Sequence, residues 1–143
     1  MLQAPETTAV GVLLDPFQSP VLDKVRIEQF TKAMNDPNPV HVDEEFCRSI
    51  GLTGIIAPGG MAVVALAHSV VRHFGLDALR EVDVALKSPT YPGERLICSP
   101  EVTDVLDGCL EISCRVTNEA GDLKAQGRVV VTDRARPERS DLR

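Results

Sequence analysis

The sequence predicts an α+β domain in which one antiparallel sheet wraps around a single apolar helix. Residues 60–74 form the most apolar stretch and have the length of a helix. From residue 82 onward, apolar and polar residues alternate with the period of two that marks half-buried strands, and Asp107-Gly108 is a hairpin signal. Such a helix and such a sheet can bury their apolar surfaces against each other. A chain of 143 residues can form this core as one domain, residues 1–143.

The first third of the chain is expected to contain a short strand and a helix. Residues 10–14 are a short apolar run typical of a strand. Residues 21–25 fit either a second short strand or the approach to a helix. Apolar side chains then recur at helical spacing in residues 26–34, at Ile27, Phe30 and Met34. This helix should end before Pro37, because a proline disfavours the helical conformation of the residue before it.

A second, shorter helix is predicted at residues 44–50. Asp43 fits the N-cap position, where its side chain can accept a hydrogen bond from a first-turn N–H. Glu44 and Glu45 fall in that first turn, where the helix dipole favours negative charge. Gly51 is placed to end the helix.

The central helix is predicted over residues 60–74, with Gly75 just after its C-terminus. Apolar side chains cover most of its circumference, so we expect it to be enclosed by other parts of the protein. Only its last turns, with Arg72 and His73, are expected to face water. We expect His68 and His73 to be structural or surface residues.

The remainder of the chain is predicted to be strands separated by turns. We expect strands at residues 82–86, 96–105, 110–117 and 123–132. There is no internal repeat and no sign of a domain boundary. Residues 1–9 and 134–143 are expected to be flexible tails.

Composition excludes several classes of function. The net charge of −6 argues against a nucleic-acid-binding protein, which needs a basic face. No apolar run is long enough to span a membrane, and the N-terminus lacks the basic start and apolar core of a signal peptide. We therefore expect a cytoplasmic protein with no membrane or nucleic-acid partner.

Neither the cysteines nor the histidines form a metal-binding pattern. The cysteines are Cys47, Cys98, Cys109 and Cys114. No two of them make a Cys-x-x-Cys pair, so we expect reduced thiols. His68 and His73 are five residues apart and fall on different faces of a helix, and His41 is far away in sequence. We expect no metal and no cofactor.

Two short segments carry residues suited to proton transfer beside a helix N-terminus. Residues 36–41, Asp-Pro-Asn-Pro-Val-His, place a carboxylate and an imidazole five residues apart on a loop stiffened by two prolines. Residues 55–61, Ile-Ile-Ala-Pro-Gly-Gly-Met, form a turn that opens the central helix. A general acid/base pair beside the positive end of a helix can stabilise an anion that forms during a reaction. The two segments therefore predict an enzyme active site.

The same segments make the sequence resemble the MaoC-type dehydratases, also called (R)-specific enoyl-CoA hydratases, which have the hot-dog fold. Three sets of residues carry the resemblance, which runs from about residue 10 to residue 132. They are Asp36-x-Asn38-Pro39-x-His41, then Gly51-Leu52 with Ile56-Ala57-x-Gly59, and finally Lys87-Ser88-Pro89 leading to Pro92-Gly93-Glu94.

The resemblance implies hydration of a trans-2-enoyl-CoA, or another enoyl thioester, to the (R)-3-hydroxyacyl thioester, or the reverse dehydration. Asp36 and His41 would activate the water that attacks the β-carbon. The backbone N–H of Gly59, or of Gly60 if the turn is shifted by one residue, would stabilise the enolate that forms on the thioester oxygen. Asn38 and Pro39 would position the loop.

The resemblance also implies partners. The substrate would be carried on CoA or on an acyl-carrier protein. Domains of this family pair into a continuous sheet, and each site is completed by the neighbouring subunit. Exposed edge strands give this pairing a physical reason. We expect a homodimer, or a heterodimer with a related hot-dog subunit.

Two positions depart from the family pattern. Many relatives have histidine where this chain has Pro58, and proline donates no N–H. Relatives also often carry a serine on the central helix near the Asp/His pair, and counting from the motif places Ala67 there.

Other interpretations remain open. Taken singly, Asp36 can be a loop aspartate that bonds nearby amides, His41 a half-buried histidine bonded to a carbonyl, and Gly59 and Gly60 turn residues. Pro58 and Ala67 keep open a non-catalytic or half-catalytic subunit of a heterodimer. A hot-dog acyl-CoA thioesterase is a further alternative, and it would release free thiol.

Overall fold

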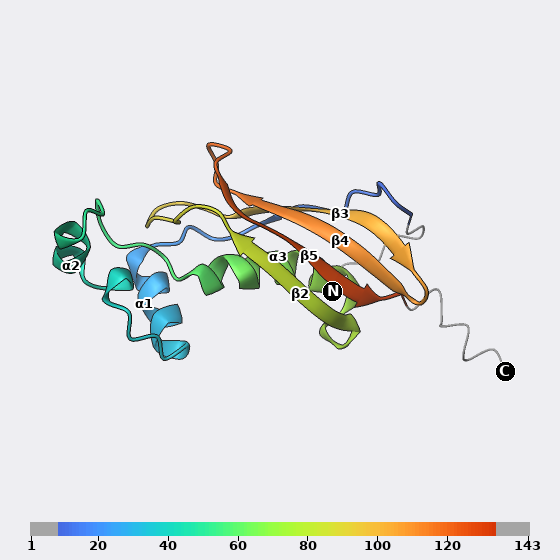
Figure 1. The fold of residues 1–143 in the computed structure, drawn as a ribbon, viewed down its shortest axis with the longest axis horizontal. Helices are drawn as coiled ribbons and strands as arrows, with labels where there is room; N and C mark the ends of the chain where they lie inside the picture. Colours follow the sequence, from blue (N-terminus) through green and yellow to red (C-terminus); the bar gives the residue numbers. More distant parts are fainter. Residues whose placement is uncertain (1–8, 134–143) are drawn as a thin grey trace.

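One five-stranded antiparallel sheet packs against a long helix in the computed structural model, which describes residues 9–133 (Figure 1). The strands are β1 (Phe17–Gln18), β2 (Leu79–Leu86), β3 (Ile97–Leu106), β4 (Cys109–Thr117) and β5 (Leu123–Thr132). The helices are α1 (Lys24–Ala33), α2 (Glu44–Ser49) and α3 (Gly59–Phe74), with short 3-10 turns η1 (Pro39–His41) and η2 (Leu76–Ala78). The sheet order is β1-β3-β4-β5-β2, so β1 and β2 are its edges. The tails expected at residues 1–9 and 134–143 lie outside the described residues, apart from residue 9.

The core lies between α3 and the inner face of the sheet. Leu66 and Val70 of α3 are fully buried. Fully buried side chains from the strands share this core, among them Val102, Ile112, Val129 and Val131. Complete burial of one such side chain contributes about 1.5–3 kcal/mol. The α+β arrangement predicted from the alternating pattern is therefore confirmed, and the predicted bounds of α3 and of the four long strands hold to within a few residues.

The segment at residues 10–14 is not the strand that its apolar sequence predicts. It runs beside β3, and the Gly11 N–H donates to the Val102 carbonyl at 2.8 Å, but only one isolated bridge forms, between Leu13 and Glu101. Gly11 has a φ of +90°, which interrupts the extended conformation that a strand requires. The short edge strand β1 forms later, at Phe17–Gln18.

The helix ends follow the local sequence. The Asp43 side chain accepts a hydrogen bond from the Phe46 N–H at 2.9 Å, which confirms the predicted N-cap of α2. Asp23 caps α1 in the same way, so residues 21–25 lead into a helix and form no second strand. Gly51 and Gly75 follow α2 and α3 with φ near +90°, a conformation that favours glycine.

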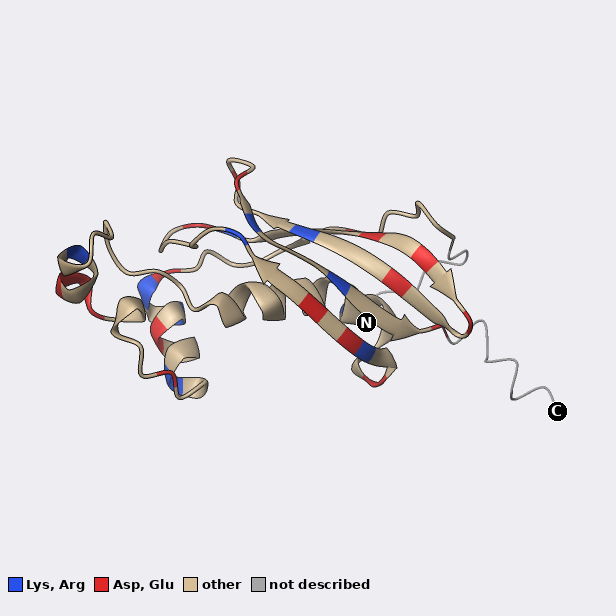
Figure 2. Ribbon diagram, viewed as in Figure 1, with Lys and Arg blue, Asp and Glu red and all other residues tan. Residues whose placement is uncertain are grey.

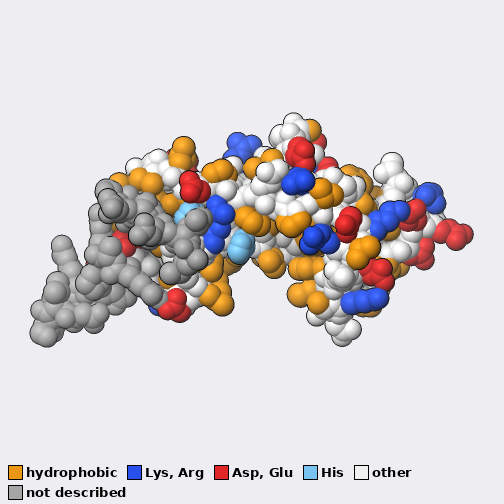
Figure 3. All heavy atoms as spheres, turned by 180° about the vertical axis from the view of Figure 1, so that it is seen from behind, with side chains coloured by type: hydrophobic (Ala, Val, Ile, Leu, Met, Phe, Trp, Pro, Cys, Tyr) orange, Lys and Arg blue, Asp and Glu red, His pale blue; other side chains and the backbone are white. Residues whose placement is uncertain are grey.

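The surroundings of α3 differ from expectation at two places. His73 is only 4% exposed, although it was expected to face water, because the last turn also packs inward. Val64, in contrast, is 56% exposed, so one face of α3 is open in the single chain. Seen from behind, hydrophobic side chains reach the surface between charged ones across the middle of the molecule (Figure 3). Within residues 9–133, no helix combines the length and apolar character needed to cross a bilayer.

Charged residues of both signs are interspersed along the strands (Figure 2). Arg128 of β5 forms ion pairs with Glu81 of β2 at 2.6 Å and with Glu111 of β4 at 3.1 Å. These partly exposed pairs cross the face of the sheet that lies opposite α3.

Close approach of β2 and β5 gives a test of the fold. A Cβ added at Gly127 would lie 2.3 Å from the Asp83 carbonyl oxygen and 3.0 Å from the Val84 Cα. These are backbone atoms that cannot rotate away, so we expect Gly127→Ala to lower the free energy of unfolding by about 1–3 kcal/mol in urea denaturation. Gly54→Ala is the matched control: nothing lies within 4 Å of its added Cβ. We expect a change within about 0.5 kcal/mol there. Equal stability of the two variants would contradict this strand packing.

Candidate active site

The Asp-to-His loop begins where α1 ends and is shaped by two short polar side chains. Asn35 has a φ of +51° and turns the chain out of the helix. Oδ1 of Asp36 then accepts a hydrogen bond from the Asn38 N–H at 3.0 Å. The side-chain oxygen of Asn38 accepts one from the Val40 N–H at 3.2 Å and so caps η1. Pro39 occupies the first turn of η1, where its missing N–H costs nothing.

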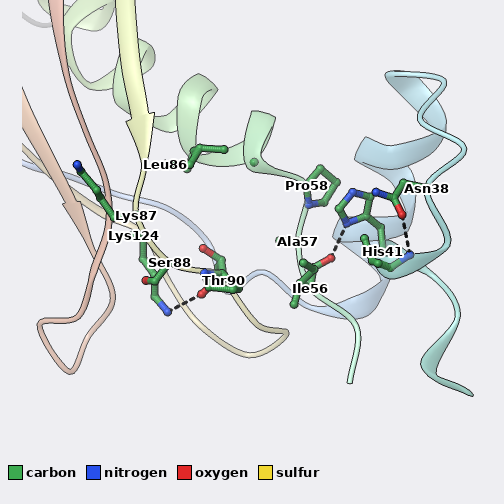
Figure 4. Close-up of a pocket in the computed structure, with 14 residues that line it drawn as sticks. Asn38, His41, Ile56, Ala57, Pro58, Leu86, Lys87, Ser88, Thr90 and Lys124 are labelled. Atoms are coloured by element: carbon green, nitrogen blue, oxygen red, sulfur yellow. Dashed lines mark hydrogen bonds between the residues drawn. The ribbon is translucent and has the colours of Figure 1, made fainter. Parts of the chain in front are cut away.

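His41 is 7% exposed and is held by the segment that leads to α3. Its Nδ1 lies 2.7 Å from the Ile56 carbonyl oxygen (Figure 4). The Ile56 N–H in turn donates to the Val40 carbonyl at 3.0 Å. These two bonds join the segments at residues 36–41 and 55–61, which are separated in sequence by α2.

The bond to Ile56 determines what the other ring nitrogen of His41 can do. A carbonyl oxygen only accepts, so Nδ1 must carry the hydrogen. Nε2 lies 3.3 Å from Oδ2 of Asp36. As a neutral imidazole, His41 presents a lone pair at Nε2 that can accept a proton; as an imidazolium, it pairs with the Asp36 carboxylate. The arrangement is therefore suited to proton transfer.

The N-terminus of α3 lies next to this pair. Pro58 occupies the N-cap and makes no side-chain capping bond, and Gly59 and Gly60 are the first two helical residues. Their N–H groups have no acceptor within the helix, because an α-helix leaves its first four N–H groups unpaired. The positive end of the helix dipole adds to their attraction for an anion. A Cβ at Gly59 would lie 2.3 Å from the Leu86 side chain, so the start of α3 packs closely against the end of β2.

A pocket of about 340 Å³ brings these groups together (Figure 4). His41 and Asn38 line one side of it, and α3 contributes Gly59 and Ala62. Gly59, rather than Gly60, is the glycine that borders the pocket. Within residues 9–133, Asp36 and Ala67 are not among the residues that line it. Asp36 adjoins the lining residue His41, with 3.3 Å between its Oδ2 and Nε2 of His41, and Ala67 lies farther along α3.

The opposite wall includes residues 87–89, which carry part of the family resemblance, together with three residues that the sequence did not single out. Leu86 ends β2, Thr90 follows in the β2–β3 loop (residues 87–96), and Lys124 belongs to β5. The Ala57 N–H donates to the Thr90 carbonyl at 2.7 Å, so this wall is bonded to the segment that carries the helix start. One signal in the sequence pointed to it, namely a lysine between the two apolar residues Leu123 and Ala125 at the start of β5.

The described part of the chain offers no metal site. No group of three or more His, Cys, Asp or Glu side chains in residues 9–133 is placed to hold an ion. The four cysteines carry free thiols, and Cys47, Cys98 and Cys114 are buried.

Comparisons with known proteins bear on the family and the fold. The UPF0336 protein of Streptomyces avermitilis is 27% identical over 121 residues, which are 76% of this chain and 79% of the relative. The ChsH1-ChsH2 complex from Mycobacterium tuberculosis matches with a TM-score of 0.80 at 22% identity, covering 90% of this chain and 100% of the other. The R-hydratase PhaJ1 from Pseudomonas aeruginosa matches with a TM-score of 0.79 at 21% identity, covering 92% and 83%.

These structural matches show that the fold is a hot-dog fold. The family model described as "FAS1-like, dehydratase domain region" matches residues 8–133, which is most of the sequence. The chain therefore belongs to this FAS1-like family of dehydratase domains, and its resemblance to the MaoC-type dehydratases is confirmed.

Proposed function

We propose that the protein hydrates a trans-2-enoyl thioester to the (R)-3-hydroxyacyl thioester and catalyses the reverse dehydration. One observation carries the proposal. The His41 imidazole is fixed by the Ile56 carbonyl, its Nε2 lies against Asp36, and it borders the same pocket as Gly59. Membership of a dehydratase family supports a hydro-lyase reaction of this kind.

In the hydration direction, a water molecule sits at the edge formed by His41 Nε2 and Asp36 Oδ2. One of these groups takes a proton from the water while the water oxygen bonds to the β-carbon. The electrons of the double bond move onto the thioester oxygen as an enolate. A proton then returns to the α-carbon, so that one water is added and both side chains regain their starting state. Positioned proton transfer of this kind contributes about 10²- to 10⁴-fold in rate.

The enolate is the charge that the start of α3 is suited to stabilise. The Gly59 N–H borders the pocket at the positive end of the helix, and the absence of a side chain leaves the thioester oxygen free to approach. Pro58 supplies no N–H, so this donor falls to Gly59. Asn38 and Pro39 support the loop that holds the acid/base pair.

We further propose that the active form is a dimer that acts on a CoA or carrier-protein thioester. β2 is an edge strand that pairs with β5 on one side only in the described sheet, and the exposed Val64 opens one face of α3. The likeness to the ChsH1-ChsH2 complex, in which two chains are named, favours a second version in which this chain is one subunit of a heterodimer. Pro58 and Ala67, which depart from the family pattern, favour the same version.

Purified protein distinguishes these possibilities. Loss of the conjugated enoyl-thioester absorbance, with an (R) product on chiral analysis, is expected for the chain alone if it is a homodimeric hydratase. Turnover that requires a co-expressed related subunit would establish the heterodimer instead. Release of free thiol without hydration would contradict both hydratase hypotheses and indicate a thioesterase.

Removing either member of the acid/base pair tests their roles. We expect Asp36→Asn and His41→Ala each to lower kcat by about 10²- to 10⁴-fold, because water loses its proton acceptor. Asp43→Asn is the matched control: it removes a nearby carboxylate but keeps a good N-cap, so kcat should not change. Circular dichroism should report the same fold in all three. Near-normal turnover in either of the first two variants would rule out the role of that residue.

Two substitutions at Gly59 isolate its N–H group. Gly59→Pro deletes the donor at the first helical position, where proline is well tolerated and where Pro58 already has an extended ψ of 137°. Gly59→Ala adds a Cβ against Leu86 but keeps the N–H. If the donor stabilises the enolate, kcat of the proline variant should be about 10²- to 10³-fold below that of the alanine variant. Equal kcat values would mean that another group carries the charge.

A further inference from the structure

Lys124 is a buried lysine with an unusual position in the sheet. It is only 4% exposed. In the pairing of β4 with β5, Val116 lies opposite Ala125 and Thr117 lies opposite Leu123, so Lys124 is an extra residue without a partner across the strand. Such a bulge turns a side chain away from its regular direction. Here the lysine side chain reaches the β2–β3 loop and lines the pocket (Figure 4).

The side chain of Lys124 bonds the loop at two points. Its Nζ donates to the Pro89 carbonyl at 2.8 Å and pairs with Oε1 of Glu94 at 3.1 Å. The same ammonium lies 5.7 Å from the centre of the Tyr91 ring. The backbone of the bulge adds to this attachment, because the Lys124 carbonyl accepts hydrogen bonds from the N–H groups of Lys87 and Ser88.

Glu94 is the second fixed point of the loop. Its Oε2 accepts the Tyr91 N–H at 2.8 Å, and its Oε1 also accepts from the Asn118 amide at 2.9 Å. Burial, the largest single influence, acts to raise the pKa of this carboxyl. The bonds from Tyr91, Asn118 and Lys124 together outweigh burial and hold the pKa below its usual value. Glu94 is therefore ionised near neutral pH, and its pair with Lys124 is a charged one.

The loop fixed in this way is bonded to the segment that carries the oxyanion donor. Thr90 lies between Pro89 and Tyr91, and its carbonyl accepts the Ala57 N–H at 2.7 Å. Ala57 is two residues before Gly59. Connected contacts therefore run from the bulge in β5, through the loop, to the start of α3.

We propose that Lys124 and Glu94 are positioning residues that hold the β2–β3 loop so that Thr90 fixes Ala57 and, through it, the Gly59 N–H in the pocket. This inference rests on the proposed hydratase function for its effect on rate, but its structural part does not. A donor for a developing charge loses effect when it is displaced even slightly, so loosening the loop should slow the chemical step more than it weakens substrate binding.

The test uses the double variant Lys124→Met/Glu94→Gln in the full chain. Substituting both residues avoids leaving one buried charge unpaired, and glutamine keeps an acceptor for the Tyr91 N–H. Arg128→Met is the matched control, since it removes another paired cation from β5 on the face opposite α3. Two readouts are required: amide hydrogen exchange of Ala57 and Ile56 by NMR, and kcat and KM by enoyl-thioester absorbance.

The expected result is selective. In the double variant the Ala57 N–H should exchange at least about tenfold faster, while the neighbouring Ile56 N–H, which bonds Val40 on the other side, should keep its protection. kcat should fall about tenfold or more with KM changed less than about threefold. Arg128→Met should change none of these quantities.

Several outcomes would overturn the inference. Unchanged exchange of the Ala57 N–H would show that Lys124 and Glu94 do not hold Ala57 through the loop. Equal acceleration of exchange at Ala57 and Ile56 would mean that the fold has loosened generally. Faster Ala57 exchange with unchanged kcat would remove the positioning role. If the wild-type protein shows no hydratase turnover but Ala57 exchange still responds selectively, the proposed reaction fails while the structural link stands.

Discussion

Burial of α3 against the inner face of the sheet is the contact on which the rest of this structure depends. Leu66 and Val70 have no exposed surface, and they share one core with buried aliphatic side chains of the strands. Fixing the helix also fixes its N-terminus at one end of the sheet. The unpaired N–H groups there, the end of β2 and the loop after it thus meet at one place. The position of the candidate site is therefore set by the position at which the buried helix α3 begins.

The sequence could predict those parts of the fold whose cause is local or periodic. Strands with strict alternation were located because side-chain direction has a period of two, and Asp43 was identified as a cap because its neighbours are the groups it bonds. The segment at residues 10–14 could not be read in this way. Its apolar content suits a strand, but Gly11 adopts a positive φ. This φ depends on how the segment packs beside the sheet, so the local sequence does not show it. The burial of His73 likewise depends on distant packing.

The candidate site divides in the same manner. Asp36, His41 and Gly59 could be predicted as candidates because short segments carry them at characteristic spacing, and the structure brings these segments together. On the opposite wall, Leu86, Thr90 and Lys124 were not predicted as site residues. A bulge is a property of pairing between two strands, so no window of single-chain sequence shows that Lys124 turns toward a pocket. Spacing therefore predicts the candidate reactive groups, whereas strand pairing decides which residues lie around them.

The location of His41 has a consequence for heat resistance. α1, η1 and α2 project beyond one end of the sheet (Figure 1), and their main packing is among themselves. The imidazole thus sits on a small projecting unit that is joined to the helix start by two backbone-directed bonds through Ile56. A unit with few buried contacts opens at lower free energy than the central strands. Opening of this unit on warming should accordingly precede melting of the β-structure and should reverse on cooling.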